Sequence, residues 1–272
     1  MTSARMSTLA SLRGRIERIE TPEGAGLSAG ALNRVALGHA QADAVLRGGL
    51  ATAAIHEVFS EGRQSTVATG FIAGLAGRVL AGRVSARRPL VWVRQDFCEL
   101  EAGALSMQGL VELGLDPRCL VTVRASDVES ALRTTADALA CDALGAVVLE
   151  VWGQAKQLDL VASRKLTLAA QASGVTGLLL RIAAEPLPST AETRWIVRAA
   201  HSPPETPCGV WGSPCFDAEL ARNRHGPTGR WIMGWKCDEC LFSEATDSQS
   251  LAATPAHRPH QAFARAEQRL AG

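Results

Sequence analysis

The feature that most constrains this chain is a regular alternation of short apolar runs and helical segments between residues 54 and 182. Five apolar runs predict β-strands, at residues 54–59, 89–93, 120–123, 146–151 and 175–182. The intervening segments predict helices, at residues 67–80, 100–113, 128–139 and 158–172. Such alternation is typical of a parallel sheet with helices on both faces and right-handed crossovers. The sequence therefore predicts an α/β fold.

Outside this region the pattern changes. After Pro186 and Pro188, three segments predict antiparallel strands, at residues 194–199, 216–223 and 230–236, the last two joined by a turn at residues 225–229. Apolar density falls from residue 243 on, so we expect a disordered tail. The expected organisation is an N-terminal amphipathic helix region (1–24), an α/β core (25–200), an antiparallel β extension (201–242) and the tail (243–272).

Charge and cysteine content exclude several classes of protein. There are 28 Lys and Arg residues against 27 Asp and Glu residues, a net charge of +1, which does not indicate a general nucleic-acid or membrane binder. The longest apolar runs are far too short to cross a bilayer, and the N-terminus shows no apolar secretory segment. Seven scattered cysteines do not form a disulfide framework. We expect a cytoplasmic protein with reduced thiols and no membrane partner.

The turn after the first predicted strand is where an α/β protein would bind phosphate. The phosphate-loop pattern needs a second Gly, a Lys and a Ser or Thr in succession. The Gly lets backbone N–H groups wrap the phosphates, the Lys neutralises their charge, and the hydroxyl binds Mg²⁺. The corresponding residues here are Ser65, Thr66 and Val67, so every chemically demanding position is lost. The loop also contains Ser60, Gly62 and Arg63. A simple strand–helix turn without a cofactor is the prediction; the alternative is an unorthodox nucleotide loop with Arg63 as its cation.

Several segments, taken in chain order, resemble the ImuA family, SOS-linked relatives of RecA and of the division inhibitor SulA. The segments that carry the resemblance are Gly48-Gly49-Leu50, Ile55-His56-Glu57-Val58, Leu90-Val91-Trp92-Val93-Arg94-Gln95-Asp96, Leu113-Gly114-Leu115-Asp116-Pro117, Leu120-Val121-Thr122-Val123, Gly145-Ala146-Val147-Val148-Leu149-Glu150 and Arg230-Trp231-Ile232-Met233. The resemblance implies a RecA-like core with a mostly parallel sheet flanked by helices, and a small antiparallel C-terminal β extension.

The resemblance also implies a function. ImuA proteins work with ImuB, a catalytically inactive relative of Y-family polymerases, and through it with an error-prone DNA polymerase that copies damaged DNA after SOS induction. RecA is a further possible partner. Asp96 and Glu150 lie near the positions of the acidic catalytic residues of RecA-like ATPases. Because the phosphate loop is degenerate, we interpret both as vestigial and expect no ATPase activity.

Direct DNA binding has little support in the sequence. The resemblance to RecA implies two long DNA-binding loops, but the matching connections, 152–157 and 183–192, are short and lack interleaved cations and aromatics. Lys156, Arg164, Lys165 and Arg181 form at most a weak basic patch, and solvated helix faces explain them better.

Four cysteines near the C-terminus allow a structural zinc site as an alternative. They are Cys208, Cys215, Cys237 and Cys240, the last two in a Cys-x-x-Cys spacing. The seven-residue spacing of the first two is loose, so ordinary strand-end cysteines and no metal are the prediction.

Two groups of apolar residues are candidates for a partner interface. Leu9, Leu12, Ile16 and Ile19 share one face of the predicted N-terminal helix, which packs either on a partner or within the chain. Trp231 and Trp235 share one face of a predicted strand and fill a core or anchor a partner. The leading hypothesis is a non-catalytic protein that brings ImuB to damaged DNA. The alternatives are an ATPase and a SulA-like inhibitor of the division GTPase FtsZ.

Overall fold

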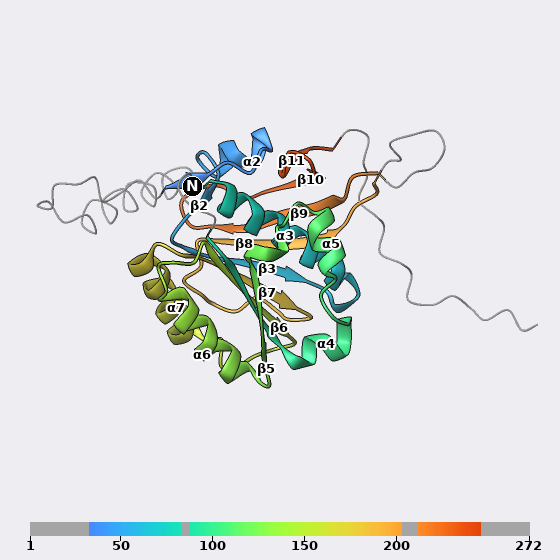
Figure 1. Cartoon of the computed structure of the whole chain (residues 1–272). Coiled ribbons are helices and arrows are strands. Elements are labelled where there is room, and N and C mark those ends of the chain that lie inside the picture. Colours follow the sequence, from blue (N-terminus) through green and yellow to red (C-terminus); the bar gives the residue numbers. More distant parts are fainter. Residues whose placement is uncertain (1–32, 83–87, 203–211, 246–272) are drawn as a thin grey trace, which may run out of the picture.

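A nine-stranded sheet organises the computed structural model, which describes residues 33–82, 88–202 and 212–245 (Figure 1). The strand order is β11-β10-β9-β8-β3-β7-β6-β4-β5. Its strands are β3 (Ile55–Ser60), β4 (Leu90–Gln95), β5 (Leu120–Ala125), β6 (Ala146–Trp152), β7 (Thr176–Ile182), β8 (Thr193–Ala199), β9 (Cys215–Asn223), β10 (Gly229–Lys236) and β11 (Leu241–Glu244). A two-stranded sheet joins β1 (Arg34–Val35) to β2 (Leu50–Ala51).

Helices cover both faces of the sheet. They are α2 (Ala40–Val45), α3 (Ser65–Ala81), α4 (Asp96–Ala102), α5 (Met107–Glu112), α6 (Val128–Leu139) and α7 (Leu160–Ser173), with short 3₁₀ turns η1 (Gly62–Gln64) and η2 (Pro117–Cys119). The core on one face contains the buried side of α3, and α6 and α7 pack on the other face (Figure 1). Strands β3, β7, β6, β4 and β5 pair in parallel, which confirms the predicted α/β fold.

The predicted helix over residues 100–113 is wrong, because this segment forms two helices. Gly103 has φ +75°, a left-handed conformation that favours glycine, and it ends α4. The Ser106 side chain then accepts a hydrogen bond from the Gly109 backbone N–H and begins α5. The first helix also starts earlier than predicted, at Asp96.

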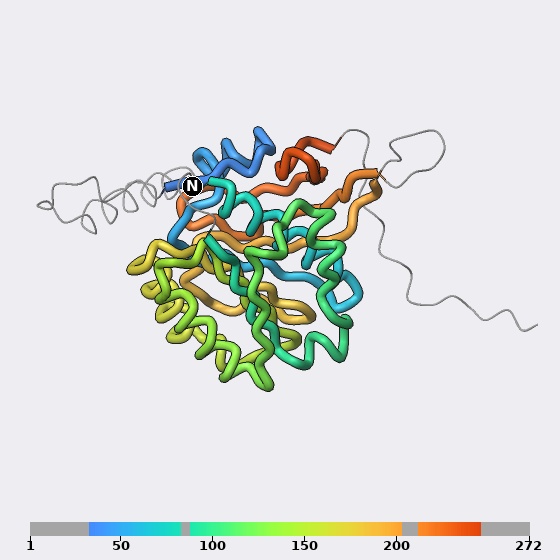
Figure 2. The backbone as a smooth tube through the Cα atoms, in the orientation of Figure 1, coloured from blue at the N-terminus to red at the C-terminus, as the bar shows by residue number. Residues whose placement is uncertain are grey.

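The predicted antiparallel strands continue the main sheet. Strand β8 pairs in parallel with β3 and antiparallel with β9, so the prediction for residues 194–199 holds for only one of its neighbours. Strands β9 and β10 form the predicted hairpin. Strand β11 was not predicted; its residues Ser243 and Glu244 contradict the predicted disordered tail at its first positions, and the tail from residue 246 on lies outside the described residues. The backbone trace shows this continuous arrangement (Figure 2).

A cluster of aromatic side chains connects the parallel and antiparallel parts. Phe71 of α3 packs against Trp195, Phe216 and Phe242, with ring centroids 5.2–5.6 Å apart. These side chains come from β8, β9 and β11, so one helix residue contacts three strands. Within the described part of the chain, every helix is too short or too polar to span a bilayer.

Candidate functional site

The degenerate phosphate loop lies at the carboxyl end of β3, the edge where parallel α/β sheets bind ligands. The loop is a short 3₁₀ turn. The Gln64 N–H donates to the Glu61 carbonyl (2.9 Å), and the Ser65 N–H donates to the Gly62 carbonyl. These amides are engaged within the turn, whereas a phosphate cradle needs successive N–H groups that point outward.

Contacts with neighbouring strands hold this turn in place. The Ala199 N–H, at the end of β8, donates to Gln64 Oε1 (2.8 Å), and the Ala183 N–H donates to the Ser60 carbonyl (2.8 Å). A Cβ added to Gly62 would lie 3.1 Å from the Trp152 ring. The turn therefore packs closely against the last residues of β6 and β8 and the residue that follows β7.

The three positions that matter most for phosphate chemistry have different surroundings. Ser65 is buried, Thr66 is exposed, and Val67 packs against the hydrophobic core. Arg63 is exposed on η1, two residues before Ser65, the first residue of α3. The loop therefore has no lysine at position 66 and no hydroxyl at position 67 to bind Mg²⁺.

Glu150 is fully buried; one of its carboxylate oxygens accepts a hydrogen bond, and the other is in an ion pair that lacks hydrogen-bond geometry. The Trp92 Nε1–H donates to Oε2 (2.9 Å), and Arg94 Nε lies 3.0 Å from Oε1. Arg94 also donates to the carbonyl oxygens of Gly103 (2.7 Å) and Cys98 (3.2 Å). Burial, with Glu150 nearby, raises the pKa of the Cys98 thiol to about 12, which keeps it protonated.

Asp96 is not part of this cluster. It begins α4 at the surface and pairs with Arg124 (2.9 Å between Arg124 Nε and Asp96 Oδ1). The structure thus places one of the two predicted acidic residues in the core and the other in a surface ion pair. Sequence reasoning missed Trp92 and Arg94, although both lie in the segment Leu90–Gln95 that carries the family resemblance.

A second buried charged cluster lies on the opposite face of the sheet. Glu57 pairs with Arg194 (2.8 Å) and accepts a hydrogen bond from the Ser189 hydroxyl (3.0 Å). The guanidinium groups of Arg181 and Arg194 lie 5.7 and 5.4 Å from the centroid of the Phe59 ring. Burial is the main cause that lowers the pKa of Arg181.

This burial corrects both interpretations of Arg181, which belongs neither to a basic patch nor to a solvated helix face. Arg181 is only 2% exposed, so it contributes nothing to a surface patch with Lys156, Arg164 and Lys165. The reason is its place in β7, between Val151 and Phe59 of the neighbouring strands. A charged residue within the apolar run 175–182 was the sequence signal for this cluster.

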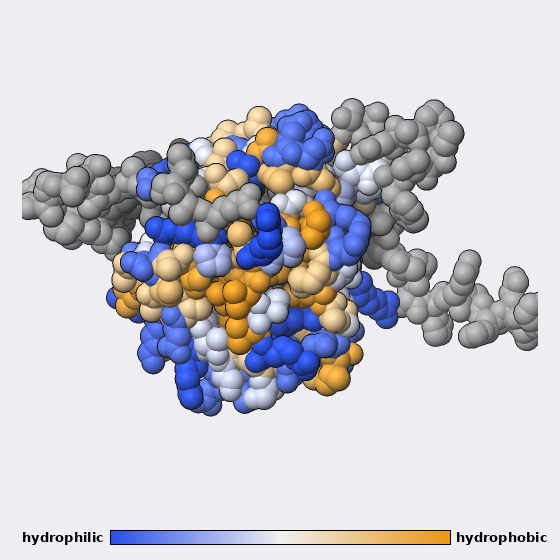
Figure 3. Space-filling model, in the orientation of Figure 1, coloured by the Kyte–Doolittle hydropathy of each residue, from blue (hydrophilic) through white to orange (hydrophobic). Residues whose placement is uncertain are grey.

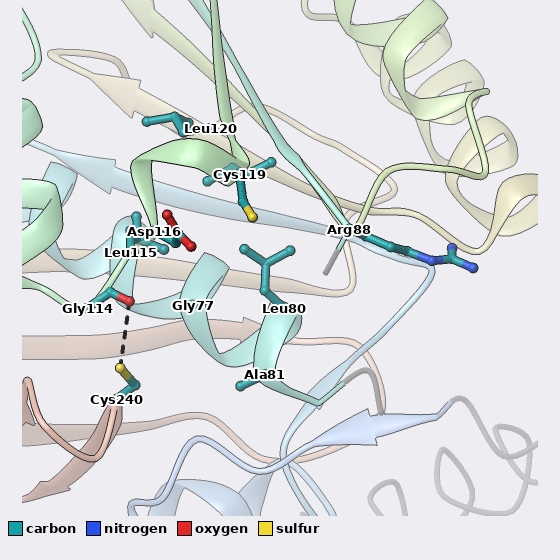
Figure 4. A pocket seen from close by; sticks show the side chains of 11 residues that line it. Gly77, Leu80, Ala81, Arg88, Gly114, Leu115, Asp116, Cys119, Leu120 and Cys240 are labelled. Atoms are coloured by element: carbon teal, nitrogen blue, oxygen red, sulfur yellow. Dashed lines mark hydrogen bonds between the residues drawn. The ribbon is translucent and has the colours of Figure 1, made fainter. Parts of the chain in front are cut away.

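Two cavities of similar volume lie at opposite edges of the sheet. One, of 230 Å³, adjoins the degenerate loop and is lined by Phe59, Ser60, Glu61, Ala183 and Arg198, among others. The other, also of 230 Å³, lies among the C-terminal end of α3, η2 and the turn at Cys240, whose thiol donates to the Gly114 carbonyl (Figure 4). Leucine side chains form much of its wall.

Of the four candidate zinc ligands, the described part of the chain contains Cys215, Cys237 and Cys240. Cys237 and Cys240 lie in the turn between β10 and β11, Cys215 is buried in β9, and Cys208 lies outside the described residues. In the described ranges, no three His, Cys, Asp or Glu side chains are grouped as metal ligands.

Of the candidate interface residues, the two tryptophans lie in the described part of the chain and the four N-terminal apolar residues do not. Trp235 is 1% exposed and packs against Phe242, so it offers no surface to a partner. Trp231 is half-buried beside Trp195 and His39. Both tryptophans face the same core, as their spacing predicts. Leu9, Leu12, Ile16 and Ile19 lie outside the described residues.

Comparison with known proteins decides the family. No protein-family model matches the chain. Protein ImuA from two strains of Caulobacter vibrioides, NA1000 / CB15N and ATCC 19089 / CB 15, is 32% identical over 204 residues, which cover 68% of this chain and 76% of each relative. The chain belongs to the ImuA family. The resemblance inferred from the segments between Gly48 and Met233 is therefore confirmed, and the ImuA-family chain has the α/β core that the resemblance implied.

Proposed function

We propose that this ImuA-family protein is a non-catalytic accessory protein in SOS-induced translesion synthesis, which recruits ImuB and, through ImuB, an error-prone polymerase to damaged DNA. The observation that carries the proposal is membership of the ImuA family in a chain whose phosphate loop has neither the lysine nor an open backbone cradle. RecA is a second proposed partner.

Two features of the carboxyl edge support a role without catalysis. Glu150 is fully buried, its Oε2 accepts a hydrogen bond from Trp92 and its Oε1 pairs with Arg94, which disfavours a role in orienting water or a metal ion. The turn at residues 61–64 bonds to itself and to β8. Burial of Arg181 also weakens the case for a DNA-binding patch on this chain.

Nucleotide titration tests the non-catalytic part of the proposal. Full-length protein is titrated with labelled ATP and Mg²⁺, alongside the variant Arg63→Ala. We expect no saturable binding at micromolar concentrations by either protein. Micromolar binding that the Arg63 substitution abolishes would instead establish an unorthodox nucleotide loop.

A pull-down with purified ImuB and RecA tests the recruiting part. Full-length protein is compared with a chain lacking residues 1–22 and a chain lacking residues 246–272, which retains all of β11. The proposal predicts capture of ImuB by the full-length protein and loss of capture in at least one truncated chain. If the intact chain captures neither ImuB nor RecA, the recruiting role is wrong.

A further inference from the structure

An apolar groove runs between the N-terminal half of α3 and the segment that contains α4 and α5. It has a volume of 190 Å³. Thr66, Thr69 and Gly70 form the α3 wall, and Leu105 and Leu110 belong to the opposite wall. The small side chains on α3 leave room between the walls for side chains from another segment.

Large apolar side chains remain exposed on the two helices that flank this groove, although none of them lines it. Four of the eight that are exposed in the described part of the chain lie on α4 and α5: Phe97 (43%), Leu100 (80%), Met107 (41%) and Val111 (48%). Figure 3 shows apolar surface where Figure 1 places these two helices. Met107 and Val111 are four residues apart, so they share one face of α5. Such clustering indicates a surface that another segment covers.

The negative charge of this surface favours a basic segment as its binding partner. Residues 96–112 contain four acidic residues and no Lys, Arg or His. Arg124, from outside the segment, pairs with Asp96 and Glu99. Glu101 and Glu112 are the other two acidic residues of the segment, which contains no basic residue to pair with them. A basic amphipathic helix would complement this combination of exposed apolar and acidic side chains.

The N-terminal segment of the same chain has that chemistry. Leu9, Leu12, Ile16 and Ile19 are predicted to share one helix face, and residues 1–20 contain four arginines and two glutamates, Glu17 and Glu20, a net charge of +2. The other exposed apolar face, around Val161 and Leu168 of α7, fits this segment poorly because Arg164 and Lys165 lie on the same helix. Like charges there would repel the N-terminal arginines.

The chain is long enough for this contact within one molecule. The described residues begin near the C-terminal end of α3, where Arg78 Nε donates to the Ala36 carbonyl (2.9 Å). From there to the groove is at most the length of α3, about 25 Å at 1.5 Å per residue. Residues 21–32 reach about 40 Å when extended.

We propose that residues 7–20 bind in this groove of their own chain, with Leu9, Leu12, Ile16 and Ile19 against α3 and α5. This inference goes beyond the proposed function and does not depend on it. One consequence is that a partner that binds the same apolar stripe must first displace it from the groove.

Photo-crosslinking on the full-length protein tests the contact. Benzoylphenylalanine replaces Leu12, on the apolar face, or Ala10, which is about 160° away from Leu12 on the helix at 100° per residue. Irradiated protein is digested, and crosslinked peptides are identified by mass spectrometry. The expected result is that the probe at position 12 crosslinks to residues 65–70 or 97–113, and the probe at position 10 does so much less.

Surface variants and isotope labelling make the test specific. Met107→Glu with Val111→Glu should reduce this crosslink by about tenfold or more, because it places two charges on the exposed apolar face of α5, next to the groove-lining residues Ser106 and Leu110. The matched pair Val161→Glu with Leu168→Glu on α7 should leave it unchanged. A mixture of ¹⁵N-labelled and unlabelled protein should give crosslinks within one molecule. Crosslinks between copies, to α7, or insensitive to the α5 variant would overturn the proposal, as would the absence of any crosslink.

Discussion

Glu150 and Asp96 are both acidic residues near the carboxyl ends of strands, yet their surroundings give them different roles. Glu150 has no exposed surface; in the core it accepts a hydrogen bond from the Trp92 N–H and pairs with the Arg94 guanidinium. Asp96 pairs with Arg124 at the surface, where solvent screens the pair. The carboxylate that looks vestigial for catalysis is thus a structural element of the core.

This difference predicts unequal effects of removing each charge. Glu150→Gln leaves the buried Arg94 guanidinium without a counter-charge, which should lower the free energy of unfolding by about 3–5 kcal/mol. Asp96→Asn should cost at most about 1 kcal/mol. Urea unfolding followed by tryptophan fluorescence measures both. Equal effects of the two substitutions would contradict the structural role of Glu150.

His56 predicts a pH dependence of stability. The side chain is fully buried, with Nε2 2.8 Å from the Ala51 carbonyl and Nδ1 2.8 Å from the Thr193 hydroxyl. A carbonyl only accepts, so Nε2 carries the proton and Nδ1 accepts from Thr193. Burial is the main cause that lowers the His56 pKa from 6.5 to about 4.

The direction of this pH dependence follows from the number of protons bound by the folded and the unfolded chain. Between pH 6.5 and about 4 the unfolded chain binds a proton at His56 and the folded chain does not, so stability falls as the pH is lowered through this range. The full loss is roughly 3 kcal/mol, at 1.36 kcal/mol per pKa unit. Unfolding free energies of the wild type and His56→Asn, measured from pH 7.5 to 4.5, check this. The variant should show the shallower slope; parallel curves would refute the assignment.

At the scale of elements, helix α3 is fitted closely to the C-terminal strands. A Cβ at Gly74 would lie 2.8 Å from Phe242 and 3.2 Å from Trp235. A Cβ at Gly77 would meet only ordinary contacts, the nearest at 3.7 Å. Both glycines lie inside the helix, where alanine is intrinsically more favourable than glycine.

This pair of glycines gives opposite predictions for the same substitution. Gly74→Ala should destabilise the protein by about 1–3 kcal/mol, because the rings must shift within a packed core. Gly77→Ala should be neutral or stabilise it by up to about 1 kcal/mol. Thermal unfolding of both variants, with circular dichroism as the signal, compares them. A stabilised Gly74→Ala variant would show that the aromatic cluster is looser than described.

The elements also show what sequence reasoning can reach. Apolar runs such as residues 146–151 predicted the parallel strands well, because a strand buried on both faces has no other pattern. The strand at Leu241–Glu244 could not be predicted, since its stability comes from pairing with β10 and from burial of Phe242, both of which are long-range or tertiary contacts. At the candidate site, the loss of the phosphate-loop residues was visible in the sequence. The Glu150–Arg94–Trp92 cluster required the register of β4 against β6.

At the scale of the whole molecule, the antiparallel strands are part of the same core as the parallel ones. Strands β3 and β8 pair directly, and the hydrophobic core beneath α3 includes residues from both parts. Leu220, Phe216, Met233, Trp235 and Phe242 are all buried there. Burial of a large apolar side chain contributes about 1.5–3 kcal/mol. The free energy lost with these five side chains is therefore comparable with the free energy of unfolding of a typical domain, about 5–15 kcal/mol.

A chain that ends at residue 200 should therefore fail to fold, although the parallel strands are all present. It leaves β8 without β9 and exposes the apolar face of α3 around Phe71. A chain that ends at residue 245 retains every described strand and should unfold cooperatively at the same urea concentration as the full-length protein. Circular dichroism against urea compares the three chains. A cooperative transition in the shorter chain would mean that the parallel core is stable alone, and only then could a truncation at residue 200 be used to locate a partner interface.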